Sequence, residues 1–409
     1  MRQRVILAAL LFIACRESAQ PPAVAAVAND PVLRHYDIRF DQLPAPFATQ
    51  SSGNPPRVGP QPPDAELHLP PGFKISLFAS SLDDPRTMLL APNGDVLVAE
   101  PGAGKITILR DANHDGTAEQ RFTFASGLRE PFGLAFNGPW LYVGDVDGVV
   151  RLPYTSGATA SSAKPEPIVA LPSGGHSTRG VIFDRTGTKM FVSVGSQSNV
   201  SAGEEPRRAA ILLMSPDGKN ERIFAAGLRN PIGMDWEPKS GALWTVVNER
   251  DGLGDDLVPD YATDVRDGAF YGWPYAYLGT HEEPRRRGER ADLVQKTIPP
   301  ALLIQSHSAP IGITFYNGTM FPPQYRGAAF VGLHGSWNRS NRTGYKIISI
   351  PFRNGKPAGG YDDFVTGWAP DEHSRQVWGR PACLVVLGDG SLLISDDGAG
   401  KVWRVSYGR

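Results

Sequence analysis

The stretch APNGDVLVAEPGAGKITIL, residues 91–109, decides the fold, because it joins two apolar strands through turns rich in Gly, Asn and Pro. The same order of turn, apolar strand, polar turn and apolar strand returns in residues 134–154, 181–196, 234–249, 312–337 and 384–407. Strand-rich units that repeat at intervals of tens of residues are typical of β-propellers. The sequence therefore predicts an all-β protein built from repeated blades.

The spacing of the units predicts the number of blades. The innermost strands are expected to begin at Met88, Gly133, Gly180, Gly233, Gly312 and Cys383. The successive spacings are 45, 47, 53, 79 and 71 residues, so the first three match a four-stranded blade and the last two add long loops. We predict a six-bladed β-propeller in which a strand near residues 73–79 completes the last blade. A seventh blade hidden in the interval of 79 residues is the alternative.

The N-terminus has the pattern of an export signal. Arg2 and Arg4 precede an apolar run from Val5 to Ala14, which is too short to span a bilayer and matches a signal-peptide core. Cys15 stands where a bacterial lipoprotein carries its lipidated cysteine. The sequence predicts an exported protein, either periplasmic or lipid-anchored at the bacterial cell envelope, with the anchor as its one contact with a membrane.

The chain divides into three expected parts. These are a signal peptide of residues 1–15, a flexible tether and Pro-rich lead-in of residues 16–68, and a catalytic propeller domain of residues 69–409. The Pro-rich part is unsuited to a sheet interior and is expected to wrap the domain surface. The second cysteine, Cys383, has no expected disulfide partner and lies at the start of an apolar strand, where a small buried core residue is expected.

Composition narrows the classes of function. Gly and Pro, at 45 and 37 residues, exceed their usual share, as many tight turns between strands require. The net charge of −1 argues against a nucleic-acid partner, for which a basic face is expected. No GxGxxG turn follows a strand and opens a helix, so a nicotinamide dinucleotide fold is not indicated.

A histidine at the start of an innermost strand is the main catalytic candidate. His176 lies in GGHSTRGVIFD, residues 174–184, where two glycines let the main chain approach a ligand closely. An imidazole with an ordinary pKa near 6.5 suits proton transfer at neutral pH. We expect His176 to lie over the central channel as a general base; a purely structural histidine is the alternative.

Four arginines occupy the turn that enters an innermost strand in four different units: Arg86, Arg129, Arg229 and Arg380. A ring of positive charge in a chain of net charge −1 indicates a multiply anionic ligand. The alternative is that these arginines join neighbouring blades by bonding to main-chain carbonyls.

Two acidic loops are candidate calcium sites. Residues 248–261, NERDGLGDDLVPDY, crowd carboxylates around glycines, as Ca²⁺ prefers; a solvated acidic loop is the alternative. Residues 111–120, DANHDGTAEQ, open like a calcium loop, but Phe122 stands at the twelfth position in place of the bidentate Glu. Calcium binding and a plain turn rich in Asp and Asn both stay open for this second loop.

Further candidates lie near the fifth innermost strand. HSAPIG, residues 307–312, and HGSWNRSNRTGYK, residues 334–346, place His307 and Trp337 beside several cations. Trp337 is suited to cover a flat ring by stacking, with a place in the blade core as the alternative. The arginine-rich run of residues 285–290 is expected in a solvated loop.

Taken together, these segments resemble the soluble sugar dehydrogenases that depend on pyrroloquinoline quinone (PQQ), nearest to the sorbosone dehydrogenases. The carrying segments are GGHSTRGVIFD, GLRNPIGM, NERDGLGDDL, GAFYGWPY, HSAPIGITFY and HGSWNR…TGYK, and the likeness covers residues 69–407. The resemblance implies a six-bladed propeller with PQQ lying flat over the channel and Ca²⁺ as a second cofactor.

The resemblance also implies roles for single residues. His176 would take the proton of the sugar's anomeric hydroxyl, and Arg229 would polarise the accepting quinone carbonyl. The residues expected at the cofactor are Arg86, Arg129, Arg229, Asn230, Arg250, His307, Trp337 and Arg380. The Ca²⁺ ion would be held largely by main-chain carbonyls near Asp251 and Gly252.

The chain departs from this family pattern at two places. Ser196 stands where the glucose-oxidising members carry the Asp that orients the base, so His176 is expected to be oriented differently or to be less basic. The family's cofactor-covering pair is replaced around Gln305–His307, and its lysine falls near Arg342 or Lys346. These departures leave the choice of sugar open.

We predict an exported quinone-dependent dehydrogenase that oxidises an aldose or a related hydroxy-aldehyde, such as sorbosone. Its electrons would pass to a respiratory acceptor, a quinone or a cytochrome. A calcium-dependent lactonase propeller is one alternative, which requires an axial metal held by carboxylates. A non-catalytic propeller that binds a glycan or a protein is the other, and it requires no contribution from His176.

Overall fold

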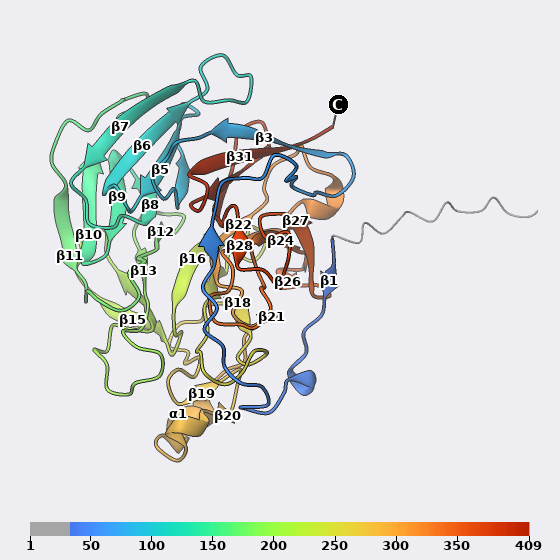
Figure 1. The fold of residues 1–409 in the computed structure, drawn as a ribbon. Helices are drawn as coiled ribbons and strands as arrows, with labels where there is room; N and C mark the ends of the chain where they lie inside the picture. The colour runs from blue at the N-terminus through green and yellow to red at the C-terminus, as the bar shows by residue number, and fades with distance from the viewer. Residues whose placement is uncertain (1–32, 409) are drawn as a thin grey trace, which may run out of the picture. The chain divides into compact units, whose positions relative to one another are not determined.

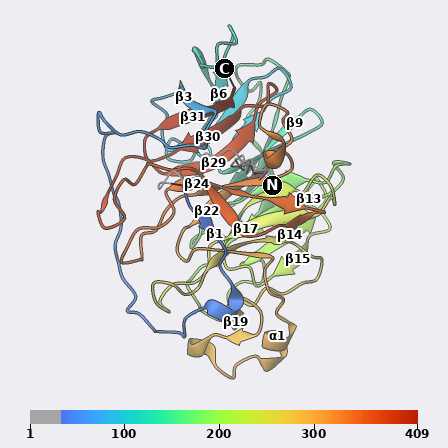
Figure 2. The same cartoon turned by 90° about the vertical axis from the view of Figure 1, so that its right-hand side faces the viewer.

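The computed structural model of the chain describes residues 33–408, and the structural statements below concern these residues. The predicted signal peptide and the first part of the predicted tether lie outside them. Four-stranded antiparallel sheets are arranged in a ring around a common axis, as Figures 1 and 2 show. One short α-helix, α1 (Ala291–Lys296), and three 3₁₀ turns, η1 (Phe40–Gln42), η2 (Pro284–Arg286) and η3 (Pro323–Tyr325), lie in the connections.

The first three blades follow one another along the chain with short connections. Blade 1 consists of β4 (Met88–Leu90), β5 (Val96–Glu100), β6 (Lys105–Arg110) and β7 (Gln120–Ser126). Blade 2 consists of β8 (Gly133–Asn137), β9 (Trp140–Asp145), β10 (Gly148–Pro153) and β11 (Glu166–Ala170). Blade 3 consists of β12 (Val181–Phe183), β13 (Met190–Val194), β14 (Ala210–Met214) and β15 (Arg222–Ala226).

The last three blades carry the longer connections. Blade 4 consists of β16 (Pro231–Trp236), β17 (Leu243–Val247), β18 (Asp260–Asp264) and β21 (Leu302–Ile304). Blade 5 consists of β22 (Pro310–Phe315), β23 (Ala329–Leu333), β24 (Lys346–Ile350) and β27 (Tyr361–Val365), with β1 (His35–Tyr36) at its outer edge. Blade 6 consists of β29 (Pro381–Val386), β30 (Leu392–Asp396), β31 (Lys401–Tyr407) and β3 (Phe73–Ala79).

The six-bladed prediction is confirmed, and each innermost strand begins two residues or fewer from its expected start. The ring closes as predicted, because β3 pairs antiparallel with β31 and so joins the beginning of the domain to its end. The described part of the long interval before blade 5 holds no seventh blade. It holds an excursion with the small hairpin of β19 (Ala276–Tyr277) and β20 (His281–Glu282) and the helix α1.

Glycines in the innermost strands allow neighbouring blades to approach closely at the axis. A Cβ atom on Gly133 would lie 2.3 Å from the main-chain oxygen of Arg179, and one on Gly233 would lie 2.5 Å from that of Ile311. Both oxygens belong to the chain at the innermost strand of a neighbouring blade. The glycine at the start of four of the six units is therefore a packing requirement of the ring.

The central channel has a volume of about 460 Å³ and is lined by the six innermost strands. An apolar cluster of Phe132, Ile232, Ile311, Ala382 and Cys383 lies where innermost strands begin, and three of its members line the channel. Cys383 is buried there, as expected, and burial raises the pKa of its thiol to about 12.

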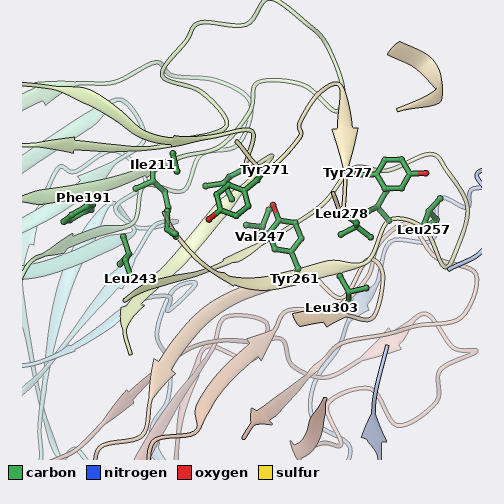
Figure 3. Close-up of a cluster of buried hydrophobic side chains, with 14 of the residues drawn as sticks. Phe191, Ile211, Leu243, Val247, Leu257, Tyr261, Tyr271, Tyr277, Leu278 and Leu303 are labelled. Atoms are coloured by element: carbon green, nitrogen blue, oxygen red, sulfur yellow. The ribbon is translucent and has the colours of Figure 1, made fainter. Parts of the chain in front are cut away.

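The largest apolar cluster lies between blades 3 and 4 (Figure 3). Phe191 and Ile211 of blade 3 pack with Leu243 and Val247 of blade 4, and the cluster continues into the excursion through Tyr271. Each fully buried side chain of this size contributes roughly 1.5–3 kcal/mol. The excursion is thereby fixed against the ring by its own apolar residues.

The described part of the Pro-rich lead-in, which was expected to wrap the domain surface, is bonded to the propeller. The amide of Phe47 donates to the main-chain oxygen of Leu253 at 2.8 Å, and that of Asn54 donates to Trp337 at 2.7 Å. Three residues after Asn54, β2 (Arg57–Val58) begins and pairs parallel with β28 (Gln376–Val377). A last small hairpin joins β25 (Phe352–Arg353) and β26 (Lys356–Pro357). Within residues 33–408, no helix has the length and apolar character needed to cross a bilayer.

Candidate active site

A pocket of about 240 Å³ lies at the axis, at the end of the ring beyond the apolar cluster. Its lining comes from loops of blades 3 to 6: His176, Arg229, Asn248, Glu249, Asp251, Asp260, His307, Ala309, Ile311, His334, Gly335, Trp337, Asn338 and Arg380. The channel and a groove beside β6 are larger, but Arg110 and Asp95 of the groove are already paired with each other. The site is therefore assigned from its chemistry rather than from its size.

His176 is oriented by a main-chain carbonyl. Its Nδ1 lies 2.8 Å from the main-chain oxygen of Ser196 and 3.2 Å from that residue's hydroxyl. Because a carbonyl oxygen only accepts, Nδ1 carries the proton and Nε2 keeps its lone pair. Burial, with the nearby charge of Arg229, lowers the pKa of His176 to about 4. The imidazole is therefore neutral at pH 7.

Arg229 lines the pocket with its guanidinium held on several sides. It donates to the main-chain oxygen of Glu249 at 2.8 Å and to the side-chain oxygen of Asn199 at 3.1 Å, and it pairs with Asp251 at 3.2 Å. Both roles predicted for this arginine, binding an anionic ligand and joining segments through main-chain carbonyls, are therefore compatible with its position. It joins the loop after β17 to the start of β16 through carbonyls, and it presents a fixed positive charge to the pocket.

Asp251 and His307 form a second charged pair. Nδ1 of His307 lies 3.7 Å from a carboxylate oxygen of Asp251, which also accepts from the amide of Asn338 at 2.5 Å. Burial alone would raise the pKa of Asp251, but His307 and Arg229 lower it below its ordinary value. In the same way, burial would lower the pKa of His307, but Asp251 and the carbonyl of Gly254 raise it.

The geometry does not fit calcium at the predicted position. The main-chain oxygen of Asp251 already accepts from Nδ2 of Asn199 and from Nη1 of Arg285, each at 2.9 Å. A Cβ atom on Gly252 would lie 3.0 Å from the same guanidinium nitrogen. A cation bound at this oxygen would meet a charged guanidinium. Residues 33–408 also gather no set of three or more carboxylate, histidine or cysteine ligands.

The second predicted calcium loop is a turn rich in Asp and Asn. The two carboxylate oxygens of Asp111 accept from the amides of Asp115 and Gly116, at 3.1 and 2.8 Å. The carboxylate of Glu119 accepts from two further amides of the same loop. These oxygens therefore stabilise the turn itself.

Arg229 and Arg380 are the members of the predicted arginine ring that reach the pocket. Arg380 donates to the main-chain oxygens of His334 and Gly335 at 3.2 and 3.3 Å. Arg86, which was also expected at the cofactor, is not part of the pocket lining. Its Nε lies 2.7 Å from a carboxylate oxygen of Asp397.

Arg129 and Arg250 do not lie at the pocket, which corrects their expected place at the cofactor. Arg129 is two-thirds exposed and pairs with Asp147 beside a separate groove. Arg250 is fully buried and bonds to Glu249 at 2.8 Å and to Glu283 at 3.4 Å. The same turn position in each unit therefore does not give the arginine side chains a common direction.

Asn230 is not part of the pocket lining, whereas Trp337 is. Asn230 is buried outside the lining, and its side-chain oxygen has no hydrogen-bond partner within the described residues. Trp337 is 52% exposed at the pocket, so it is not part of a blade core. The two candidates for the family's lysine, Arg342 and Lys346, are buried outside the lining; Lys346 pairs with Asp363 at 2.6 Å.

Sequence reasoning did not find the pair of His334 and Asp397. Nε2 of His334 lies 2.8 and 2.7 Å from the two carboxylate oxygens of Asp397. The histidine was quoted in HGSWNR without a role, and Asp397 comes 63 residues later, so no local motif connects them.

The family is shown by a comparison over most of the chain. The model of the TrAA12-like family matches residues 67–267 and 281–408. The chain belongs to the TrAA12-like family. This match confirms the family resemblance to PQQ-dependent sugar dehydrogenases that the motifs above carry.

Two relatives of this TrAA12-like protein are similar to it over most of the chain. It is 29% identical over 355 residues to an uncharacterized protein of Borreliella burgdorferi, covering 83% of this chain and 91% of the relative. It is 22% identical over 405 residues to the pyrroloquinoline quinone-dependent pyranose dehydrogenase of Coprinopsis cinerea, covering 84% of this chain but 55% of that longer protein.

The holo form of the PQQ domain of that Coprinopsis enzyme has a similar fold. Its TM-score is 0.72 at 20% identity, with 86% of this chain and 99% of that chain covered. At this level of identity the likeness establishes the propeller fold.

Proposed function

We propose that this TrAA12-like protein is a PQQ-dependent dehydrogenase that oxidises a sugar at a hydroxyl-bearing carbon. The observation that carries the proposal is the neutral imidazole of His176, with Nε2 unprotonated, in one pocket with Arg229 and Arg380. The name of the Coprinopsis relative, a PQQ-dependent pyranose dehydrogenase, supports the cofactor and the substrate class.

The charges of the pocket fit an anionic cofactor. Asp251 pairs with Arg229, and burial raises the pKa of Asp260 to about 7, so that carboxyl is only about half ionised at neutral pH. Arg229 and, below its raised pKa, His307 share the single charge of Asp251, and Arg380 adds a further positive group to the lining. PQQ carries several carboxylates, which such groups bind well. The exposed indole of Trp337 at the mouth offers a face for a flat ring.

The chain's own residues supply the proton chemistry. Nε2 of His176 would accept the hydroxyl proton of the sugar while the electron pair of that bond forms the new carbonyl. Bound PQQ would accept the hydride from the same carbon. Arg229 keeps its charge throughout and stabilises negative charge that develops beside it. The carbonyl of Ser196 holds the imidazole in place but, being neutral, stabilises the imidazolium less than a carboxylate would.

The substrate and cellular context form the finer part of the proposal. An aldose or a related hydroxy-aldehyde, such as sorbosone, is the proposed substrate, and a respiratory quinone or cytochrome is the proposed acceptor. The charged and apolar pattern of residues 2–15 supports export, with Cys15 as the residue that a lipid would modify.

Dye reduction by the purified protein tests the proposal. Apo-protein is loaded with PQQ, and the rate of reduction of an artificial acceptor is measured with a panel of aldoses and hydroxy-aldehydes. We expect sugar-dependent reduction that requires PQQ. PQQ binding without turnover on any member would place the substrate outside these classes. An absence of PQQ binding would overturn the proposal and favour a lactonase or a binding module.

A further inference from the structure

His334 lines the pocket and has one ring nitrogen bonded to a carboxylate. Its Nε2 contacts both carboxylate oxygens of Asp397, and Asp397 is itself held by Nε of Arg86 at 2.7 Å. Because the carboxylate accepts, Nε2 carries the proton and Nδ1 keeps its lone pair. Within residues 33–408, Nδ1 has no hydrogen-bond partner, and His334 lines the pocket. The ring is therefore fixed in one tautomer with an unused acceptor.

A cationic donor lies beside this acceptor. Arg380 donates through Nε and Nη2 to the main-chain oxygens of His334 and Gly335, and its third nitrogen, Nη1, bonds to none of the described residues. The ring of Tyr345 lies 5.9 Å from the guanidinium carbon. One part of the pocket wall thus combines a neutral lone pair with a fixed positive charge.

The surroundings of His334 keep its imidazole neutral. Burial, followed by the charges of Arg380 and Arg86, lowers its pKa to about 3 in spite of Asp397. The imidazole stays neutral and accepts a hydrogen bond without taking the proton.

A ligand that satisfies both groups carries an N–H donor next to a carboxylate on one edge of a flat ring. The pyrrole ring of PQQ has this arrangement. We propose that Nδ1 of His334 accepts from the pyrrole N–H of PQQ while Arg380 pairs with the neighbouring carboxylate. Arg86 and Asp397 then act as positioning residues that keep the acceptor nitrogen free. This assignment rests on the proposed function and sets the direction in which the cofactor lies.

Equilibrium binding tests the assignment without turnover. Apo-protein is titrated with PQQ and with PQQ methylated at the pyrrole nitrogen, for the wild type and for His334→Ala. The wild type should bind PQQ at least about tenfold more tightly than the methylated form, because one hydrogen bond is lost. His334→Ala should bind PQQ about tenfold more weakly than the wild type and discriminate little between the two forms.

Two further variants separate this role from a structural one. His334→Asn keeps an acceptor near the place of Nδ1 and should recover much of the affinity for PQQ. His281→Leu changes an exposed histidine outside the pocket and should leave the affinity unchanged. Thermal unfolding of each variant checks that it folds.

Three results are decisive against the assignment. Equal affinity of the wild type and His334→Ala for PQQ would overturn it, and so would equal discrimination against the methylated form by both proteins. Unchanged affinity with a lower rate and a shifted pH profile would make His334 a second base. If the wild type binds no PQQ, the proposed function itself fails, and this result differs from all three results above.

Discussion

Nδ1 of His176 lies 2.8 Å from the main-chain oxygen of Ser196, and this contact determines which nitrogen of the ring is free. In this chain a main-chain carbonyl orients the imidazole, because Ser196 stands where the family pattern has an Asp. The sequence predicted a different orientation or a lower basicity for His176, and the contact provides the first while burial and Arg229 provide the second.

Replacement of His176 by Asn should lower the rate of sugar oxidation by roughly 10²–10⁴-fold, since general bases contribute about this much. The affinity for PQQ should change little. Steady-state dye reduction and PQQ titration on the same preparation measure both quantities. Turnover close to that of the wild type in a folded, PQQ-loaded variant would remove His176 from the base role.

The depressed pKa of His176 also predicts a pH dependence of stability. Its pKa is about 4 in the folded chain against about 6.5 when unfolded, so the unfolded state binds the proton first as the pH falls. The contribution of this group is complete above pH 6.5 and is lost on acidification toward pH 4.

Urea unfolding at several pH values, for the wild type and for His176→Asn, measures this contribution. Asp260, with a raised pKa, acts in the opposite direction, so the difference between the two proteins is the quantity to compare. The free energy of unfolding of the wild type should fall more steeply between pH 6.5 and 4. Parallel curves would mean that the imidazole is not buried in its neutral form.

Removal of calcium should leave PQQ binding unchanged. The carbonyl of Asp251 is occupied by Asn199 and Arg285, so no cation is expected there. The affinity for PQQ is measured with a chelator and with added Ca²⁺, and the calcium content of the protein is determined by elemental analysis. A large loss of affinity on chelation, restored by Ca²⁺, would show that Arg285 moves aside for the ion.

Replacement of Gly233 by Ala should destabilise the ring. The new methyl group would meet the main-chain oxygen of Ile311 at 2.5 Å, and overpacking of this kind costs about 1–3 kcal/mol. Gly388→Ala is the matched control, because no atom lies within 4 Å of a Cβ atom there. Urea unfolding of both variants measures the effect, and equal stability would mean that the blades separate easily at the axis.

The fold was predictable because its determinants are local and repeated. Alternating apolar strands and glycine-rich turns predict blades, and the apolar strand at residues 73–79 predicts the closure with β31. The position of His176 at the start of an innermost strand placed it correctly at the end of the channel. These features depend on neighbours in sequence or on the symmetry of the ring.

The arrangement of the charged groups was less predictable because it depends on partners far away in the chain. Arg250 turns inward to Glu283, and Arg129 turns outward to Asp147, although neither carboxylate lies in the quoted motif of its arginine. The calcium position predicted at Asp251 does not fit for the same reason. Arg285, which lies in the excursion of blade 4, already donates to the main-chain oxygen of Asp251.

Titration of the apo-protein with PQQ, followed by absorbance, is the most direct test of the central claim. The wild type, Arg229→Met and Arg129→Met are compared, because one arginine lies at the pocket and the other outside it. We predict saturable binding of one PQQ per chain, weakened by the first substitution and unaffected by the second. No saturable binding, or equal loss with both variants, would contradict a PQQ site at this pocket.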